Sequence, residues 1–248
     1  MSKVMLITGA SRGIGAATAR LAAGQDYRVV INYQRNREAA EALVESIASA
    51  GGEALAVQAD VADEAQVRRL FAELDARFGR LDVLVNNAGM LEQQIRLERM
   101  SLERWQRVFA TNVYGSFLCS REAIARMSTR QGGHGGAIVN VSSIAARLGA
   151  PEEYVDYAAA KGAVDSMTVG LAKELAADGI RVNAVRPGVI DTEIHASGGE
   201  PQRVARVAAS IPLGRGGQAE EVAEAILWLA SEQASYTTGS LLDVSGGR

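Results

Sequence analysis

Short apolar segments alternate with longer helical patterns along most of the chain, and this alternation limits the folds that are open to it. The segments with strand character are Val4–Ile7, Val29–Ile31, Ala54–Val57, Leu81–Val85, Ala137–Val141, Arg181–Val185 and Leu241–Val244. The segments with helical character lie near 13–25, 38–50, 63–78, 101–127 (one bent helix or two), 154–177 and 219–231. The order favours an α/β fold, a doubly wound parallel sheet of about seven strands with helices on both faces.

The bulk composition narrows the choice of protein class. With 248 residues, 48% of them hydrophobic, the chain suits one α/β domain over residues 1–248 with a sizeable core. The net charge is −3 and the basic residues are scattered, which excludes an electrostatic footprint for nucleic acid. The first apolar segment begins at Val4 and no apolar run reaches the roughly 18 residues of a membrane span, so we expect a soluble cytoplasmic protein. The single cysteine, Cys119, excludes an intramolecular disulfide and a cysteine-based metal cluster, and we expect it to be a buried core thiol.

A glycine-rich turn, Thr8–Gly15, stands between the first strand and the first helix. Glycine at positions 9, 13 and 15 permits positive φ and lets backbone amides and the first helical turn approach a pyrophosphate. The stretch 9–15 is therefore a candidate dinucleotide site in a Rossmann-like domain. The spacing G-x-x-x-G-x-G differs from the general G-x-G-x-x-G fingerprint, and a purely structural tight turn is the alternative reading.

Tyr157 and Lys161 form a second candidate pair, four residues apart on one helix face with only small residues between them. A nearby ammonium stabilises a phenolate and lowers the tyrosine pKa, which suits proton transfer to a carbonyl. An ordinary surface pair is the alternative. Ser142 and Ser143 end the strand before this helix, at the sheet edge where open α/β folds bind ligands. Strand pleating points the two serines oppositely, and we expect Ser143 to face the substrate.

Taken together, these features resemble the short-chain dehydrogenase/reductase family, in its short single-domain branch. The resemblance spans nearly the whole chain and rests on Thr8–Gly15, Asp60, Asn86–Gly89, Asn112, Ser143, Tyr157, Lys161 and Pro187–Gly188. It implies an oxidoreductase that transfers hydride between a nicotinamide and a carbonyl or secondary alcohol. Within the family, the chain is similar to bacterial glucose-dehydrogenase-like and β-ketoacyl-carrier-protein-reductase-like members.

The same resemblance implies a role for each catalytic position. Tyr157 is the acid/base, and Ser143 polarises the substrate oxygen. Lys161 binds the nicotinamide ribose and tunes Tyr157, and Asn112 organises a water relay behind Lys161. The implied cofactor-binding residues are Gly9, Ser11, Arg12, Gly13, Ile14, Gly15, Tyr33, Arg35, Asp60, Val61, Asn87, Ala88, Gly89, Tyr157, Lys161, Pro187, Gly188, Ile190 and Thr192. No metal site is expected. One departure is that Ser143 and Tyr157 are one residue farther apart than is usual in the family, so the loop near 151–154 is lengthened.

The end of the second strand indicates which dinucleotide the chain prefers. An NAD enzyme usually places a carboxylate there to bind both ribose hydroxyls, whereas this chain has Tyr33 and no acid before Glu38. Arg12 and Arg35 can meet a 2′-phosphate with forked, charge-assisted hydrogen bonds. We therefore expect NADP(H) to be preferred and NAD(H) to be tolerated; solvated surface charges are the alternative reading of the two arginines.

Two loops stand outside the sheet rhythm. Residues 190–217 have the position of a substrate lid, and their polar residues, including His195 and Arg203, either recognise a polar substrate or face water. Gly132–Gly136 has the composition of a flexible connection with His134 in solvent. The sequence leaves the small-molecule substrate open between a sugar, a ketoacyl thioester and a small ketone or aldehyde.

Family members are mostly homotetramers, and the apolar faces of the two long helices near 101–127 and 154–177 are suited to such an assembly. The alternative is that these faces only cover the sheet. Two other functions use the same fold: a dinucleotide-sensing regulator, which would not need Tyr157 or Lys161, and an isomerase or dehydratase that uses the same cleft.

Overall fold

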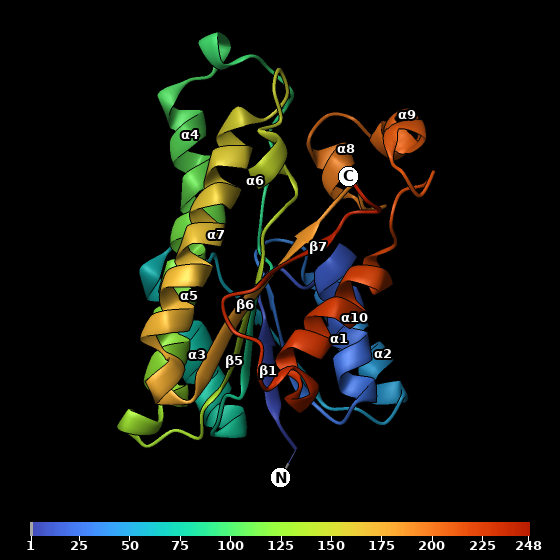
Figure 1. Cartoon of the computed structure of the whole chain (residues 1–248). Coiled ribbons are helices and arrows are strands. Elements are labelled where there is room, and N and C mark those ends of the chain that lie inside the picture. Colours follow the sequence, from blue (N-terminus) through green and yellow to red (C-terminus); the bar gives the residue numbers. More distant parts are fainter. Residues whose placement is uncertain (1) are drawn as a thin grey trace.

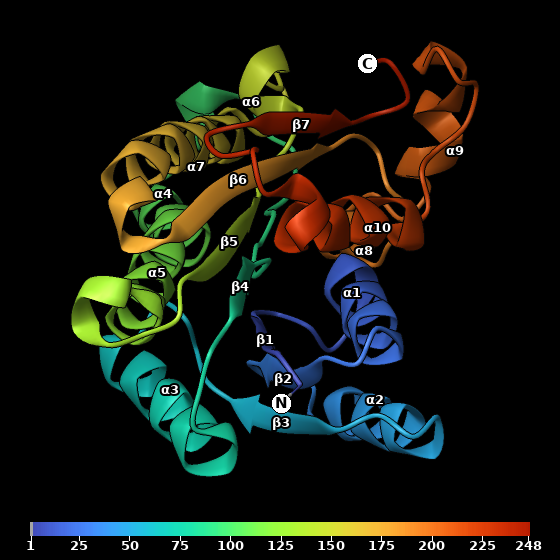
Figure 2. The same cartoon turned by 60° about the horizontal axis from the view of Figure 1, so that its bottom comes forward.

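A single parallel sheet organises the computed structural model, which describes residues 2–248. Seven strands lie in the order β3-β2-β1-β4-β5-β6-β7, and every neighbouring pair is parallel (Figures 1 and 2). Their bounds are β1 Val4–Ile7, β2 Arg28–Tyr33, β3 Ala54–Gln58, β4 Val83–Asn86, β5 Gly136–Val141, β6 Ile180–Pro187 and β7 Leu241–Val244. The chain adds β2 and β3 on one side of β1 and then β4 to β7 on the other side. Such a switch point, here between β1 and β4, opens a crevice at the carboxyl ends of the strands.

Helices cover both faces of this sheet (Figure 2). One face carries α1 (Gly13–Gly24), α2 (Arg37–Ser49) and α10 (Ala219–Ala230). The other carries α3 (Glu64–Phe78), α5 (Gly115–Met127) and α7 (Val155–Glu174), with α4 (Leu102–Phe109) packed on α7. The short helices are α6 Ala145–Leu148, α8 Ile194–Ser197 and α9 Arg203–Val207, with 3-10 turns at η1 Leu97–Arg99, η3 Thr129–Gln131, η4 Ala176–Asp178, η5 Ala208–Ser210 and η6 Glu232–Ala234.

The core has two halves because side chains alternate along each strand. In β1, Met5 and Ile7 belong to the apolar cluster under α1, α2 and α10, whereas Val4 and Leu6 belong to the cluster under α3, α5 and α7. Cys119 lies fully buried in the second cluster, and burial raises the pKa of its thiol to about 12. The predicted doubly wound α/β fold and the predicted buried thiol are both confirmed.

The long helical region over 101–127 is one path with a local defect. α4 runs into a π-helical turn, η2 (Ala110–Tyr114), which continues directly into α5. A π turn carries an extra residue and is common at functional sites. Here it contains the buried Asn112. Among residues 2–248, no helix combines the length and the apolar character needed to cross a membrane.

The glycine-rich loop before β5 differs from the flexible connection that its composition indicates. His134 is exposed, as predicted. Gly135, however, has φ +75°, and a Cβ there would lie 2.5 Å from the carbonyl oxygen of Gly179. Gly132 has a similar φ of +87°, but a Cβ there would meet nothing within 4 Å. Close backbone packing therefore explains Gly135, whereas the turn conformation alone explains Gly132.

These two glycines give a matched stability test. Both alanine substitutions carry the cost of a positive φ, but only Gly135→Ala also forces a side chain into a neighbouring backbone. We expect Gly135→Ala to lower the free energy of unfolding by roughly 1–3 kcal/mol more than Gly132→Ala does. Urea denaturation at one fixed protein concentration measures the difference, and equal losses for the two variants would contradict the packing argument.

Candidate active site

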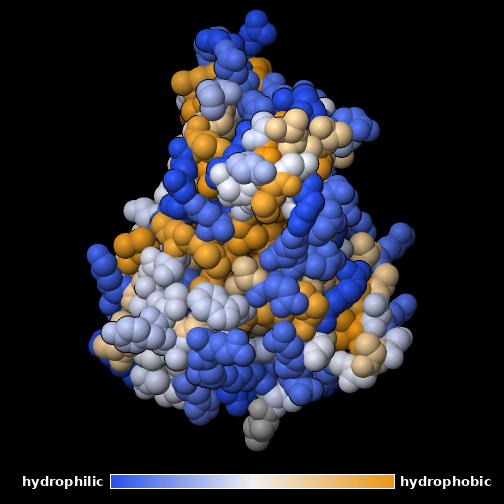
Figure 3. Space-filling model, turned by 45° about the vertical axis from the view of Figure 1, so that its right-hand side comes forward, coloured by the Kyte–Doolittle hydropathy of each residue, from blue (hydrophilic) through white to orange (hydrophobic). Residues whose placement is uncertain are grey.

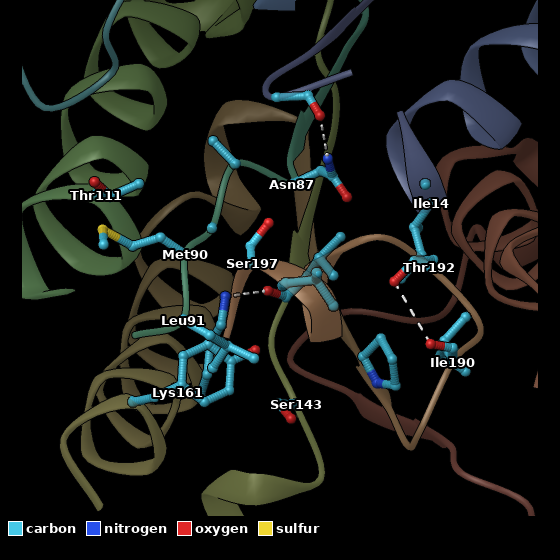
Figure 4. A pocket seen from close by; sticks show the side chains of 18 of the residues that line it. Ile14, Asn87, Met90, Leu91, Thr111, Ser143, Lys161, Ile190, Thr192 and Ser197 are labelled. Atoms are coloured by element: carbon cyan, nitrogen blue, oxygen red, sulfur yellow. Dashed lines mark hydrogen bonds between the residues drawn. The ribbon is translucent and has the colours of Figure 1, made fainter. Parts of the chain in front are cut away.

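A cavity of about 950 Å³ opens at the carboxyl ends of the strands (Figure 4). On the face of the molecule shown in Figure 3, apolar residues gather across the middle of the surface. The cavity is lined by nearly all of the predicted cofactor and catalytic residues: Gly9, Ser11, Arg12, Gly13, Ile14, Tyr33, Arg35, Asp60, Val61, Asn87, Ala88, Gly89, Ser143, Tyr157, Lys161, Pro187, Gly188, Ile190 and Thr192. Gly15 and Asn112 are the two predicted residues that stand behind this lining.

The glycine turn is shaped by contacts with the loop after β4. Gly9 has φ +61°, and a Cβ there would lie 2.8 Å from the Cα of Ala88. A Cβ at Gly15 would lie 2.8 Å from the Cα of Ala10, so this glycine allows the helix to pack closely against the turn. Asn87 fixes the same geometry, because its Nδ2 donates to the carbonyl oxygens of Thr8 at 2.8 Å and Gly9 at 3.1 Å.

The N-terminus of α1 faces this turn without a side-chain cap. Its N-cap residue, Arg12, makes no capping hydrogen bond through its side chain. The first amides of a helix then remain available as donors, and the helix dipole favours an anion at that end. The turn and the helix end together fit the pyrophosphate of a dinucleotide.

Lys161 and Ser142 join α7 to the end of β5. The Lys161 Nζ donates to the carbonyl oxygen of Val141 at 2.8 Å, and the Ser142 Oγ donates to the carbonyl oxygen of Lys161 at 3.2 Å. Ser142 is thereby buried at 2% exposure, whereas Ser143 is half-buried and its Oγ accepts from the Ala145 amide at 3.1 Å. The two serines have different surroundings, and Ser143 is the one that interacts with Tyr157.

Burial dominates the protonation of the tyrosine and lysine. It raises the pKa of Tyr157 to about 12, and a hydrogen bond with Ser143 acts in the opposite direction. It lowers the pKa of Lys161 to about 8, against the effect of the Asp165 carboxylate. The expected net lowering of the Tyr157 pKa is therefore wrong for this structure. The reason is geometric: the Lys161 Nζ lies 5.5 Å from the centroid of the Tyr157 ring and is bonded to a backbone carbonyl instead.

Asn112 supports the cavity wall from the π turn. Its Nδ2 donates to the carbonyl oxygens of Met90 at 3.1 Å and Val108 at 2.9 Å, and its Oδ1 accepts from the Met90 amide at 3.2 Å. A Cβ at Gly89 would lie 3.0 Å from this Oδ1 and 3.6 Å from the Lys161 Nζ. The carboxamide therefore holds the loop after β4 in place directly beside the lysine.

The cofactor end of the cavity carries unpaired positive charge. Arg12 and Arg35 are both exposed, and neither forms an ion pair with a carboxylate of residues 2–248. The Arg12 Nη2 donates to Ser197 Oγ at 3.3 Å. Asp60 has two partners in the protein, since its Oδ1 accepts from the Ala62 amide at 2.9 Å and its Oδ2 from Gln34 Nε2 at 2.7 Å.

The opposite end of the cavity contains an ion cluster that the sequence did not indicate. Arg203, only 8% exposed, bonds Glu153 at 2.6 Å and Glu200 at 3.1 Å, and its guanidinium lies 5.3 Å from the centroid of the Tyr154 ring. Glu153 lies in the loop after α6, where Ala150 and Glu152 adopt positive φ values of 43° and 63°. Two residues with strained backbone therefore lie in the loop that brings Glu153 to Arg203.

A second buried ion pair lies immediately before Tyr157. The Arg104 Nε donates to Asp156 Oδ2 at 2.6 Å and its Nη1 to the Gln93 carbonyl oxygen at 2.7 Å. Asp156 Oδ1 also accepts from the Tyr157 amide at 2.9 Å. The pair joins α4, the loop after β4 and the first turn of α7. Its only sequence signal is an acid in the first turn of a helix, which is too common to identify it.

Comparison with known proteins extends this description. A family model described as enoyl-(acyl carrier protein) reductase matches residues 9–248. The uncharacterized oxidoreductase YgfF of Escherichia coli (strain K12) is 58% identical over 245 residues, with 99% of each chain covered. A short-chain type dehydrogenase/reductase from Mycobacterium marinum superposes with a TM-score of 0.92 at 38% identity, covering 99% of this chain and 94% of that one.

A second solved structure carries a ligand. The 3-ketoacyl-(acyl-carrier-protein) reductase from Brucella melitensis, complexed with NADH, superposes with a TM-score of 0.91 at 37% identity, covering 99% of this chain and 98% of that one. These matches run from the glycine turn to the last strand, so they include the cavity as well as the sheet that frames it. With its Rossmann-type NAD(P)-binding fold, the chain belongs to the short-chain dehydrogenase/reductase family of oxidoreductases.

Proposed function

We propose that this chain is an NADP(H)-preferring oxidoreductase that acts on a carbonyl or secondary alcohol. One observation carries the proposal: Tyr157, Ser143 and Lys161 line the same cavity as the uncapped N-terminus of α1. An acid/base group and an anion-binding turn in one cleft fit a dinucleotide and a small reactant held side by side. The nicotinamide, when bound, supplies or accepts the hydride.

The chain's own residues then manage the proton. Ser143 holds the substrate oxygen and keeps it next to the phenol of Tyr157. In reduction, Tyr157 gives its proton to this oxygen as negative charge develops there. Among residues 2–248, only the Ser143 hydroxyl acts against the burial that raises the pKa of Tyr157. The Lys161 ammonium is proposed to turn from the Val141 carbonyl oxygen toward the phenolate that remains and to stabilise it. Asn112 sits beside Lys161 and is proposed to order the water that returns a proton.

The remaining positions are assigned to the dinucleotide. Gly9, Ser11, Gly13, Ile14 and Gly15 form or shape the pyrophosphate turn. Asp60 and Val61 hold the adenine, and Lys161 with Tyr157 meets the nicotinamide ribose. The walls around the nicotinamide are formed by Asn87, Ala88, Gly89, Pro187, Gly188, Ile190 and Thr192.

The charges at the end of β2 support a preference for NADP(H). The cavity there is lined by Tyr33, Gln34, Arg35 and Asn36, so a 2′-phosphate meets no carboxylate from this segment. Arg12 and Arg35 supply two guanidinium groups that no acid of residues 2–248 neutralises. Tyr33 does not repel a ribose without a phosphate, so NAD(H) is expected to bind as well. It is expected to bind more weakly, because it lacks the 2′-phosphate that the two arginines would contact.

The assembly is proposed to be a homotetramer of single-domain subunits, each with residues 190–217 as its lid. On the helices near 101–127 and 154–177, whose apolar faces are suited to such an assembly, Val113, Val164 and Met167 are buried within the chain. Phe117 remains 50% exposed, and it is joined by Tyr114 and Trp105 along the same helical path. Light scattering at micromolar protein tests this assembly, and a monomer would overturn it.

Tyr157→Phe tests the acid/base assignment. The substitution removes the phenolic proton and little else, so we expect kcat to fall by about a hundredfold or more while NADPH binding is nearly unchanged. Turnover is followed as loss of nicotinamide absorbance with a panel of ketones, aldehydes and sugars, and binding as quenching of tryptophan fluorescence. Wild-type turnover in the variant would overturn the mechanism.

The double variant Arg12→Ala with Arg35→Ala tests the cofactor preference. Each substitution removes a charge-assisted hydrogen bond that only the 2′-phosphate can accept, so the Kd for NADPH is expected to rise about a hundredfold. The Kd for NADH serves as the internal control and is expected to change by less than about threefold. Equal losses for the two cofactors would mean that the arginines act on the fold of the turn.

The pH dependence tests the role of Lys161. Because burial lowers the pKa of Lys161 to about 8, its ammonium is present below that pH and lost above it. We therefore expect kcat/KM for carbonyl reduction to be level in mildly acidic and neutral solution and to fall as the pH rises through about 8. Lys161→Arg keeps its charge throughout, so its profile should lack this step. A wild-type profile with no step in this range would remove Lys161 from the proposal.

A further inference from the structure

His195 is a buried group that the proposed proton transfer does not use. It lies in α8, within the lid segment, and lines the same cavity as Tyr157. The residue is buried, with only 8% of its surface exposed. The sequence left open whether this histidine recognises a polar substrate or faces water, and the structure rules out the second alternative.

The hydrogen bond made by one ring nitrogen fixes the character of the other. His195 Nε2 lies 2.8 Å from the carbonyl oxygen of Ile190, which can only accept. Nε2 therefore carries the proton. Burial lowers the pKa of His195, and the positive charge of Arg203 acts in the same direction, so the ring is neutral near pH 7. In a neutral ring with its proton on Nε2, Nδ1 is a hydrogen-bond acceptor.

This acceptor has no partner among the residues that the structure describes. His195 Nδ1 is buried and forms no hydrogen bond with any group of residues 2–248. Buried polar atoms are satisfied in the great majority of cases, and an exception needs an explanation, of which a bound ligand is one. The nearby guanidinium of Arg203 is already engaged by Glu153 and Glu200.

The surroundings of His195 allow one hydrogen bond to distinguish a ligand that carries a donor from a ligand that lacks one. Near His195 the cavity is lined by the apolar side chains of Val189, Ile190 and Ile194 and by the polar side chains of Glu193 and Arg203. A ligand that lacks a matching donor leaves the buried Nδ1 acceptor unpaired.

We propose that His195 Nδ1 accepts a hydrogen bond from a second polar group of the substrate. The substrate is then a carbonyl compound that also carries a donor, either a hydroxyl or an amide N–H. His195 selects for this donor while Tyr157 acts on the carbonyl. The inference rests on the proposed function, because it names the substrate class of the same cavity.

Matched ketone pairs test the selection. Hydroxyacetone and methoxyacetone differ by a donor, as do acetamidoacetone and its N-methyl derivative, and the two pairs distinguish a hydroxyl from an amide source. We expect kcat/KM to favour the donor-bearing member of one pair by about tenfold in the wild type. In His195→Phe the ratio should fall to about one, whereas His195→Gln keeps an acceptor and should keep a preference. His134→Phe is the control, because that histidine is exposed.

The ratio within a pair cancels losses that affect both ketones, such as a misplaced lid. Unchanged ratios in His195→Phe would overturn the inference and leave the proposed function standing. Tyr157→Phe separates the two: if it retains wild-type turnover of the ketones, the proposed function itself fails.

A direct measurement avoids the need for turnover. The chain has two histidines, so the variant His134→Gln, labelled in histidine nitrogen, gives the NMR signals of the His195 ring alone. With NADP⁺ bound, saturating hydroxyacetone or acetamidoacetone is expected to shift the Nδ1 resonance, and the methylated partner is not. A shift of equal size with both members of a pair, or with none of the four compounds, would overturn the inference.

Discussion

The reciprocal clamp between β5 and α7 determines how the cavity is arranged. The Lys161 side chain bonds the last carbonyl of β5, and the Ser142 side chain bonds the Lys161 carbonyl in return. Two hydrogen bonds in opposite senses fix both the position and the rotation of the helix relative to the sheet edge. Tyr157, one turn earlier on that helix, is thereby held beside the serine that follows Ser142. The relative placement of Tyr157 and Ser143 is thus a property of the strand-to-helix junction.

The buried pair of Arg104 and Asp156 extends this control to the first turn of α7. Taking two charges out of water is costly, and a buried pair is stable only where geometry and further hydrogen bonds compensate. Here both conditions hold, since Asp156 also accepts from the Tyr157 amide and Arg104 also donates to the Gln93 carbonyl. The tyrosine is therefore fixed from two sides, by the sheet edge through Lys161 and by α4 through Asp156.

The sequence predicts the parts of this architecture that depend on local pattern. Apolar periodicity located all seven strands and the long helices, and glycine chemistry located the turn before α1, because both signals lie within a short stretch of chain. The ion cluster around Arg203 and the orientation of His195 were beyond such reasoning. Their partners, Glu153 and Ile190, are set by how the lid folds back over the sheet edge. The Tyr157 pKa was misjudged for a similar reason: helical spacing places Lys161 near the tyrosine, but only the tertiary structure shows that its ammonium points to the carbonyl of Val141.

The contact between Gly9 and Ala88 has a consequence for how such enzymes diversify. The width of the cofactor cleft is set there by main chain against main chain, with no room for a larger side chain. A cleft defined in this way does not change when most other residues are replaced, and the superposition on the Brucella reductase at 37% identity fits that expectation. Residues 190–217 are held to the rest of the chain differently, by side chains such as Arg203, which bonds Glu153, together with a backbone hydrogen bond from the Leu213 amide to the Gly246 carbonyl oxygen. If residues 190–217 contact the substrate as proposed, substitutions in this one segment can change the substrate while the backbone of the dinucleotide-binding cleft stays the same.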